Sequence, residues 1–543
     1  MSADRPPVRT ILSVNFNHDG SAVLLRAGRV AGYVNTERFS RIKKHPGLRE
    51  EDLDELLDQA GAELADVDHV MLCNLHNMDS PDVARLHGSD LKETWPEFWV
   101  NQRNDEVSIR GRRIPCTVNP DHHLIHAATA YYTSPFDSSM AVAIDPTGCR
   151  AFAGKGHRLY PLRRDLDAWF NANIGYCYVS ELMFGSSIIG AGKVMGLAPY
   201  GRPADGEPEE ELPDTVHDFA SLVALADRHP RPVEVDGRQL NATLAHYIQL
   251  GLERQMAAVF ADLGPLCARN GIGRNICLSG GTALNAIATQ LAFEGSRFER
   301  MHFHPACGDD GTAIGAALWH WHHVLGNPRR HHANADLMYS VRRYSGHTVR
   351  RALEAHARDL VVEEVGDYVG KAAELIAGGA VIGWYDGASE VGPRALGHRS
   401  IVADPRDASM RDRLNSRIKF REHFRPFAPS VLNERAAEWF GLSDSPFMLR
   451  AAPVLKPGVP AITHVDGTSR LQSVTRADAP AFHGLIHAFE DRTGIPMVLN
   501  TSLNTKGEPI VETPQDAVRT LLASRLDYLV MPGLIISGRA ARA

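Results

Sequence analysis

Two stretches of the chain show the same alternation of apolar runs and short polar turns. The first contains TILSVNF (residues 10–16), SAVLLR (21–26) and VAGYVNTERF (30–39), separated by the turns NHDG and AGR. The second contains MAVAID (140–145), CRAFAGKG (149–156) and HRLYPL (157–162), with the turn PTG after its first run. Short β-rich runs bounded by Gly, Asn and Asp predict hairpins. Each stretch places an Asn or Asp at the end of its first run, so the shared layout predicts a duplicated α/β unit.

The pattern beyond these stretches predicts helices, a linker and a second domain. A helix is expected from about 240 to 269, and NICLSGGTALN (275–285) predicts a buried strand, a Gly-Gly turn and a helix. The histidine-rich segment 320–336 contains Gly326, Asn327 and Pro328, which predict a helix end and a linker. The runs VIGWYD and PMVLNTS, with helices between them, predict a separate α/β domain. We therefore expect an α/β protein with domains at 1–350 and 351–543.

Composition narrows the function classes. The 543 residues carry a formal net charge of −7, which argues against a large nucleic-acid footprint. The first ten residues lack the apolar core of a signal peptide, and no apolar run approaches the roughly 20 residues of a membrane span. The seven cysteines are scattered without a CxxC pair, so neither a disulfide framework nor a structural zinc site is expected. These features predict a cytoplasmic protein without nucleic-acid or membrane partners.

A metal site is one interpretation of the segment DHHLIHAATAYY (121–132). Asp121 suits a helix N-cap, and His122 and His126 would then project from one helix face. On this spacing alone, ordinary buried histidines remain the more common outcome. Asp145 ends a predicted strand and Asp309 begins the turn of GDDG, so both could complete a mixed N/O site for Fe²⁺, Mn²⁺, Mg²⁺ or Zn²⁺. Turn formation and N-capping remain the alternative for both aspartates.

A second constellation is cationic. The segments GPRALGHRS and RLNSRIKFREHFRPFAPS interleave basic residues with Phe420, Phe424 and Phe427. Such a segment must be partly buried, and buried guanidinium groups need anionic partners, which favours a phosphate or phosphoanhydride site over a solvated basic face. Backbone amides at Gly280 and Gly281 could also cradle phosphate, although a tight turn explains the same letters. The basic residues of the two segments are Arg394, Arg399, Arg413, Arg417, Lys419, Arg421 and Arg425.

The succession of motifs along the whole chain resembles one family. The motifs are NFNHDGSAVLL, NTERFSRIKKHPG, HHLIHAATAYYTSPF, GKVMGLAPYG, LSGGTALN, GDDGTAIGAA, GPRALGHRSIVADPR, IKFREHFRPFAPS, HVDGTSRLQSV and LNTSLNTKGEPIVETPQDA. In this order they resemble the NodU/CmcH carbamoyltransferases, which include the tobramycin-type O-carbamoyltransferases.

The resemblance implies a two-domain enzyme. The N-terminal domain would have the duplicated ASKHA (actin and sugar-kinase) fold, and the C-terminal domain would be YrdC-like. The YrdC-like domain would make carbamoyl adenylate from carbamoyl phosphate and ATP. The ASKHA-like domain would transfer the carbamoyl group to a hydroxyl of a small molecule, such as an antibiotic, another natural product or its sugar. ATP, carbamoyl phosphate and a divalent metal (Fe²⁺, Mg²⁺ or Mn²⁺) are the implied cofactors, and a homodimer is one possible assembly.

The resemblance also assigns roles to individual residues. It places the acceptor's general base at His18, whose alternative role is that of a turn histidine, and a cation near the leaving group at Lys43. The remaining assignments are metal ligands at His122, His126, Asp145 and Asp309, nucleotide contacts at Gly280, Gly281 and Asn285, and carbamoyl phosphate or ATP contacts at Arg394, Arg399, Lys419, Arg425 and Arg476.

Departures from the family pattern concern the acceptor side. Pro146 and Arg150 stand where relatives have IDGxGE, and Ala191 replaces an expected polar residue. The acceptor itself cannot be read from the loops between Asp145 and Gly201. Competing functions are an RNA- or protein-directed carbamoyl-type transferase, for which a basic stripe is lacking, and a catalytically silent nucleotide-binding scaffold. Hydrogenase-maturation carbamoyltransferases share both domains, but their zinc-finger cysteine pairs are absent from this sequence.

Overall fold

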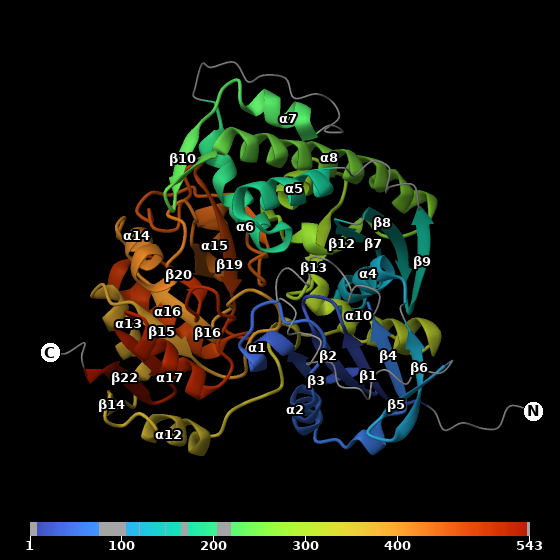
Figure 1. Cartoon of the computed structure of the whole chain (residues 1–543), viewed down its shortest axis with the longest axis horizontal. Coiled ribbons are helices and arrows are strands. Elements are labelled where there is room, and N and C mark those ends of the chain that lie inside the picture. Colours follow the sequence, from blue (N-terminus) through green and yellow to red (C-terminus); the bar gives the residue numbers. More distant parts are fainter. Residues whose placement is uncertain are drawn as a thin grey trace, which may run out of the picture.

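Figure 1 shows the computed structural model of the chain. It describes residues 8–74, 105–118, 120–146, 148–163, 172–203 and 219–539. The loops expected to shape the acceptor side lie partly outside these ranges, at residues 147 and 164–171.

The first sheet is led by a three-stranded antiparallel unit. β1 pairs antiparallel with β2, β2 pairs antiparallel with β3, and β1 pairs parallel with β4, giving the order β3-β2-β1-β4-β6-β5. The strands are β1 (Thr10–Asn15), β2 (Ser21–Arg26), β3 (Arg29–Asn35), β4 (His69–Cys73), β5 (Glu106–Ile109) and β6 (Arg112–Val118).

The second sheet repeats this topology. β7 pairs antiparallel with β8 and parallel with β12, and the order is β13-β12-β7-β8-β9. The duplicated α/β unit predicted from the two hairpin patterns is therefore confirmed. Its strands are β7 (Ser138–Asp145), β8 (Gly148–Lys155), β9 (Arg158–Arg163), β12 (Asn275–Ser279) and β13 (Arg300–Phe303).

Two helices that pack on each other lie between the two sheets. α4 (His122–Thr133) packs on β7 and β12, α10 (Thr312–Trp319) packs on β1 and β2, and the two helices pack on each other (Figure 1). Gly315 makes this approach possible, because a Cβ there would lie 2.0 Å from the carbonyl oxygen of Ile125. The histidine-rich segment after α10 forms a short helical turn and then, at residues 326–333, a linker without helix or strand, as predicted.

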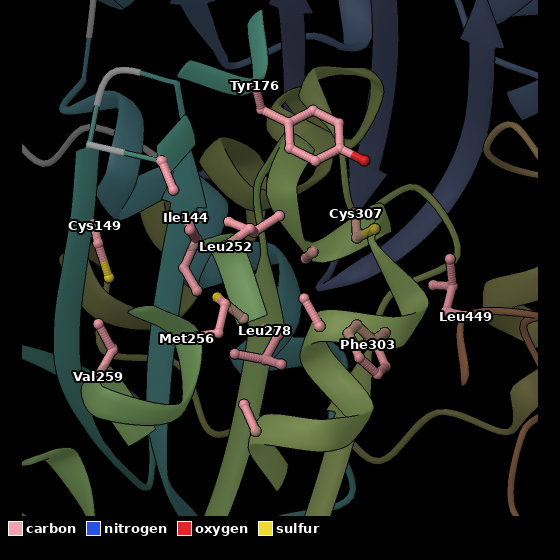
Figure 2. Close-up of a cluster of buried hydrophobic side chains, with 14 of the residues drawn as sticks. Ile144, Cys149, Tyr176, Leu252, Met256, Val259, Leu278, Phe303, Cys307 and Leu449 are labelled. Atoms are coloured by element: carbon pink, nitrogen blue, oxygen red, sulfur yellow. The ribbon is translucent and has the colours of Figure 1, made fainter. Parts of the chain in front are cut away.

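A layer of helices covers the other face of the second sheet. The long helix predicted near 240–269 is confirmed as α8 (Ala242–Arg269). Figure 2 shows part of the core between α8 and the sheet, where Leu252 and Met256 meet Ile144 and Leu278, next to the ends of β7 and β12. The other elements of this region are α1 (Thr36–Ser40), α2 (Glu50–Ala60), α5 (Ala172–Phe184), α6 (Ser187–Leu197), α7 (Phe219–Ala226), β10 (Pro232–Val235), β11 (Arg238–Asn241) and α9 (Ala286–Glu294).

The C-terminal part is built on a mixed sheet of order β14-β22-β21-β15-β16-β20-β17-β19-β18. Trp384 faces a cluster with α13 and α16, whereas its neighbour Tyr385 faces a cluster with α12 and α17, so helices cover both faces. The predicted second α/β region is thus observed. The strands are β14 (Leu360–Glu364), β15 (Ile382–Tyr385), β16 (Arg399–Ala403), β17 (Ala428–Leu432), β18 (Arg450–Pro453), β19 (Thr468–Val474), β20 (Met497–Ser502), β21 (Tyr528–Met531) and β22 (Leu534–Gly538). The helices are α11 (Asn334–Met338), α12 (Gly346–Glu354), α13 (Tyr368–Ala377), α14 (Met410–Leu414), α15 (Asn433–Phe440), α16 (Pro480–Thr493) and α17 (Pro514–Ala523).

Specific contacts connect the two parts of the chain. Arg38 donates to the carbonyl of Gly392 at 2.7 Å, and Arg41 donates to the carbonyl of Ile510 at 2.8 Å. Phe424 and Leu449 of the C-terminal part belong to the same apolar core as Leu252. The junction is therefore a packed interface.

Two further expectations concern cysteines and membrane spans. All seven cysteines lie in the described ranges, and none of them forms a disulfide there. Among the described helices, no single one is long and apolar enough to cross a membrane, although α5 and α6, bent by 89° against each other, pass that test as a pair.

Candidate functional site

The candidate metal centre starts at the N-terminus of α4. Asp121 caps the helix by accepting the amide of Leu124 at 2.9 Å, as its position in the sequence predicted. His122 and His126 then point from one face toward the ends of β7 and β12. His122 is nearly buried, and His126 is fully buried.

The carboxylates predicted to join these histidines lie beside them. Nε2 of His122 is 3.0 Å from Oδ2 of Asp145, and Nε2 of His126 is 3.1 Å from Oδ1 of Asp309. Ligand atoms of His122, His126 and Asp145 all lie within 4.8 Å of one another. Oδ1 of Asp309 is also 3.9 Å from Nε2 of His122. His122, His126 and Asp145 thus form a compact N/O donor set that fits a divalent ion, and Asp309 lies beside both histidines.

Asn74 fixes the orientation of His122. Its amide nitrogen donates to Oδ1 of Asn15 at 2.8 Å, so its oxygen faces Nδ1 of His122 at 2.9 Å. Nδ1 must therefore carry a hydrogen. Nε2 is then the ring nitrogen that, once its proton is lost to solvent, can bind a metal ion through its lone pair.

Ser279 does the same for His126. Its hydroxyl donates to the carbonyl of Cys307 at 2.9 Å, so its oxygen can accept from Nδ1 of His126 at 3.2 Å. Both histidines therefore direct Nε2 to the centre. Sequence reasoning missed Asn74 and Ser279, although each stands just after or at the end of a strand that is parallel to β1 or β7.

The charges of the centre are strongly coupled. Burial lowers the pKa of His122, but its hydrogen bond to Asp145 and the charge of Asp309 outweigh this and raise that pKa to about 9. Burial raises the pKa of Asp145, but hydrogen bonds from His122 and His123 lower it overall to far below the usual range. The carboxylates thus hold positive charge at the position where a divalent ion would sit.

His18 lies at the edge of this centre. Its Nδ1 is 2.9 Å from Oδ2 of Asp19, and its Nε2 is 3.8 Å from Oδ2 of Asp309. Asp19 is also held by Nζ of Lys44 at 2.6 Å. Burial lowers the pKa of His18, but the carboxylates of Asp19 and Asp309 raise it overall. Within the described residues His18 thus faces the centre rather than only its own turn.

The predicted phosphate turn has the geometry of a close backbone approach. Gly280 adopts φ 100°, and a Cβ there would lie 2.1 Å from the carbonyl oxygen of Ile144. Gly281 is exposed. Asn285 caps α9 by accepting the amide of Ala288 and also pairs with Gln249. The side chain of Asn285 therefore serves the fold, while the turn itself stays open; nucleotide binding here remains a prediction.

The C-terminal part gathers cations with few anionic partners. Burial first, and then the charge of Arg425, lowers the pKa of Arg394, and burial together with Arg394, Arg421 and Arg425 lowers the pKa of Arg470 well below its usual value. No acceptor among the described residues reaches the buried Nε of Arg394 or of Arg470. Arg425 has Glu422 at 3.7 Å. Such a group of guanidinium side chains is suited to a polyanion.

Sequence reasoning also missed Arg470. It lies on β19, 51 positions after Lys419, and only the sheet brings it to this cluster. Phe424 and Phe427 are buried as the interleaved pattern predicted, whereas Phe420 is half exposed.

Three predicted phosphate contacts have other surroundings. Nζ of Lys419 donates its hydrogens to oxygens of Ser502 and Asn504. Lys419 can therefore offer a phosphate its positive charge, but its N–H donors are already used. The guanidinium of Arg399 is fully buried, donates to the backbone carbonyls of Asp386, Gly387, His398 and Glu512, and stacks on Tyr385. Arg476 is exposed on the turn after β19.

The cation cluster and the metal centre adjoin each other. The charge of Asp310, next to the candidate ligand Asp309, acts on Arg394. A Cβ on Gly392, two residues before Arg394, would lie 2.5 Å from the carbonyl oxygen of Pro305. Lys43 belongs to the N-terminal part, and its positive charge helps to lower the pKa of Lys419 in the C-terminal part. Both candidate sites therefore lie at the junction between the N-terminal and C-terminal parts.

Comparison with known families places the chain among enzymes that transfer carbamoyl groups. The model for the carbamoyltransferase N-terminus matches residues 10–218 and 214–318, and the model for the carbamoyltransferase C-terminus matches residues 373–537. The chain therefore belongs to the carbamoyltransferase family, and the family predicted from its motifs is confirmed.

Individual relatives extend this result. Nodulation protein NolNO of Sinorhizobium fredii (strain NBRC 101917 / NGR234) is 35% identical over 97% of this chain and 80% of its own length. The 3'-hydroxymethylcephem-O-carbamoyltransferase of Amycolatopsis lactamdurans is 31% identical over 60% of this chain and 61% of its own. Among solved structures, T. kodakarensis HypF is 15% identical and gives a TM-score of 0.31 over 61% of this chain and 49% of its own. That likeness is too distant to say anything about ligands.

Proposed function

We propose that the protein is an ATP-dependent O-carbamoyltransferase acting on a hydroxylated small molecule. The observation that carries this proposal is the pair of candidate sites at the junction: a half-buried cation cluster with few anionic partners, and a histidine–carboxylate centre with His18 beside it. Membership of the carbamoyltransferase family and the likeness to a cephem O-carbamoyltransferase support the same reaction.

The first step would take place at the cation cluster. Carbamoyl phosphate, ATP and one water would give carbamoyl adenylate, phosphate and pyrophosphate. Apart from water, every participant carries phosphate oxygens, and guanidinium groups bind such oxygens in pairs. Arg394, Arg425 and Arg470 would bind the phosphates, and Lys419 would add positive charge from its fixed position. Arg399 would shape the loop that carries Arg394.

The second step would take place at the histidine–carboxylate centre. Nε2 of His18 would accept the proton of the acceptor hydroxyl as its oxygen attacks the carbamoyl carbon, and AMP would leave. Asp19 would hold Nδ1 of His18, so that Nε2 faces the acceptor. A divalent ion held by His122, His126, Asp145 and Asp309 would neutralise charge on the departing phosphate. Lys43 would add positive charge from the junction.

Because both candidate sites lie at the junction of the two parts of the chain, we expect carbamoyl adenylate to pass directly from one site to the other. The charges of both Arg425 and Asp310 act on Arg394, so Arg394 would offer carbamoyl adenylate a cation near the turn that carries Asp309 and Asp310. The turn at Gly280 and Gly281 would receive its nucleotide phosphate.

A mass-spectrometric assay tests the division into two steps. Purified protein is incubated with ATP, carbamoyl phosphate and Mg²⁺, and carbamoyl adenylate is measured for wild type, Arg394→Ala and His122→Ala. We expect the adenylate from wild type and from His122→Ala but not from Arg394→Ala. If folded wild type forms neither the adenylate nor pyrophosphate, the proposal is wrong.

A further inference from the structure

Helix α5 presents an apolar stripe to solvent, and the ring of its central residue Tyr178 also lies 5.6 Å from the ring of Phe219 on α7. Ile174, Tyr178 and Leu182 are exposed by 45%, 56% and 54%. Their spacing of four residues places them on one face of the helix. Eight residues at 1.5 Å each give the stripe a length of about 12 Å. On the neighbouring helix α6, Ile189 is exposed as well.

The charged side chains of these two helices are engaged elsewhere in the fold. Glu181 accepts the amide of Ser187 at 2.9 Å, and Lys193 pairs with Glu422 of the C-terminal part at 2.7 Å. The exposed residues of α5 are two aliphatic side chains and the aromatic ring of Tyr178, and none of them is charged. Single exposed apolar residues are ordinary, but a continuous stripe of them commonly marks a binding surface.

One end of the stripe adjoins the end of β7, the strand that supplies Asp145. Asn173, in the first turn of α5, donates from its side chain to the main-chain oxygen of Asp145 at 2.9 Å. Thr282, from the predicted phosphate turn, donates to Oδ1 of the same Asn173 at 2.6 Å. The next residue, Ile174, is the first member of the stripe. The apolar face is therefore continuous with the strand end that supplies a candidate metal ligand.

We propose that Ile174, Tyr178 and Leu182 bind an apolar part of the acceptor while its hydroxyl lies at the centre. This inference rests on the proposed function and deepens it, because it names the acceptor class: a hydroxylated amphiphile whose alkyl chain or apolar ring system extends about 12 Å from the reacting end. A wholly polar polyol would leave the stripe exposed. Tyr178 combines an apolar ring with a hydroxyl, which suits the border between the two parts of such a molecule.

Alkyl glucosides of different chain length provide the probe. Methyl and octyl β-D-glucoside are titrated calorimetrically into the full-length protein, with octyl glucoside kept below its micelle concentration. We expect octyl glucoside to bind at one site and at least tenfold more tightly than methyl glucoside. The variant Tyr178→Asp/Leu182→Asp should lose at least tenfold of the octyl affinity. It should keep its fold, because both side chains are more than half exposed and the ring contact of Tyr178 is with the partly exposed Phe219.

The matched control is Leu455→Asp, which changes a side chain of the same 56% exposure in the C-terminal part. It should bind octyl glucoside like the wild type. Equal methyl and octyl affinities in the wild type, or equal losses in the control and in the double variant, would overturn the proposal.

Two other occupants of the stripe give different results. If a second copy covers it, light scattering will show a wild-type dimer that Tyr178→Asp/Leu182→Asp converts to monomers. If a membrane covers it, the wild type but not the double variant will pellet with phosphatidylcholine–phosphatidylglycerol vesicles. Either result overturns the acceptor assignment. A wild type without carbamoyl-phosphate-dependent pyrophosphate release would instead refute the proposed function, whatever the glucosides do.

Discussion

The orientation of His122 by Asn74 gives a sharp prediction for metal affinity. Asn74→Gly removes the acceptor 2.9 Å from Nδ1 of His122. Asn74 has φ 60°, a left-handed conformation that glycine adopts without strain, so glycine is a better test than alanine or leucine. The variant should keep its fold and lose metal affinity.

The expected loss of metal affinity can be estimated from the hydrogen bond that Nδ1 of His122 loses in this variant. Free choice between the two neutral imidazole tautomers would cost only about a factor of two. Outer hydrogen bonds to metal-bound histidines are commonly worth about 10–100-fold in affinity. Leaving the nearly buried Nδ1–H without an acceptor costs about 1–3 kcal/mol, which corresponds to the same range. We therefore expect a loss of about 10–100-fold.

Competition with a chromophoric chelator for Fe²⁺ or Mn²⁺ measures this change. Thr117→Val is the matched control, since it removes the partner of His69 at 2.9 Å, away from the centre. Its metal affinity should equal that of the wild type. A folded Asn74→Gly protein that binds metal as tightly as the wild type, or only about twofold more weakly, would refute this reasoning.

Three further predictions concern the C-terminal part. Arg470→Ala should weaken pyrophosphate binding at least tenfold by calorimetry and should melt no lower than wild type without ligand, because it removes a half-buried charge from among like charges. Arg519→Ala, which changes an exposed side chain of α17, should alter neither property. Arg399→Ala should cost on the order of 3 kcal/mol of unfolding free energy in denaturant titration, because it leaves buried carbonyls without donors. Burial and the charges of neighbouring cations lower the pKa of Lys419 well below its usual value, whereas a bound anion favours its protonated form. Pyrophosphate binding should therefore take up protons, and the affinity should fall as pH rises through that lowered pKa. Calorimetry in two buffers of different ionisation enthalpy measures the proton uptake. Tight binding by Arg470→Ala, unchanged stability of Arg399→Ala, or proton release would contradict the respective prediction.

Local patterns were enough to predict much of the fold. Apolar runs separated by NHDG and PTG gave both antiparallel units, and Asp121 gave the start of α4, because turns and caps depend on neighbouring residues. The histidine-rich segment after α10 could be recognised as a helix end from Gly326 and Pro328 for the same reason.

The second layer of the site could not be predicted in this way. Asn74 and Ser279 reach the histidines only because β4 and β12 lie parallel to β1 and β7, and Arg470 joins the cluster only through the C-terminal sheet. Packing also decides whether the N–H donors of a basic residue are free to bind a ligand. Arg399 and Lys419 look like Arg394 in the sequence, but their donors are taken by backbone and side-chain oxygens, which depends on packing far from their own segments.

The claim most central to this account is that activation and transfer occur at separate sites. Exchange of labelled pyrophosphate into ATP, dependent on carbamoyl phosphate, measures activation without an acceptor. The account predicts exchange in wild type and in His122→Ala/His126→Ala, and none in Arg394→Ala. Exchange that disappears in the histidine variant while Arg394→Ala retains it would contradict the account directly.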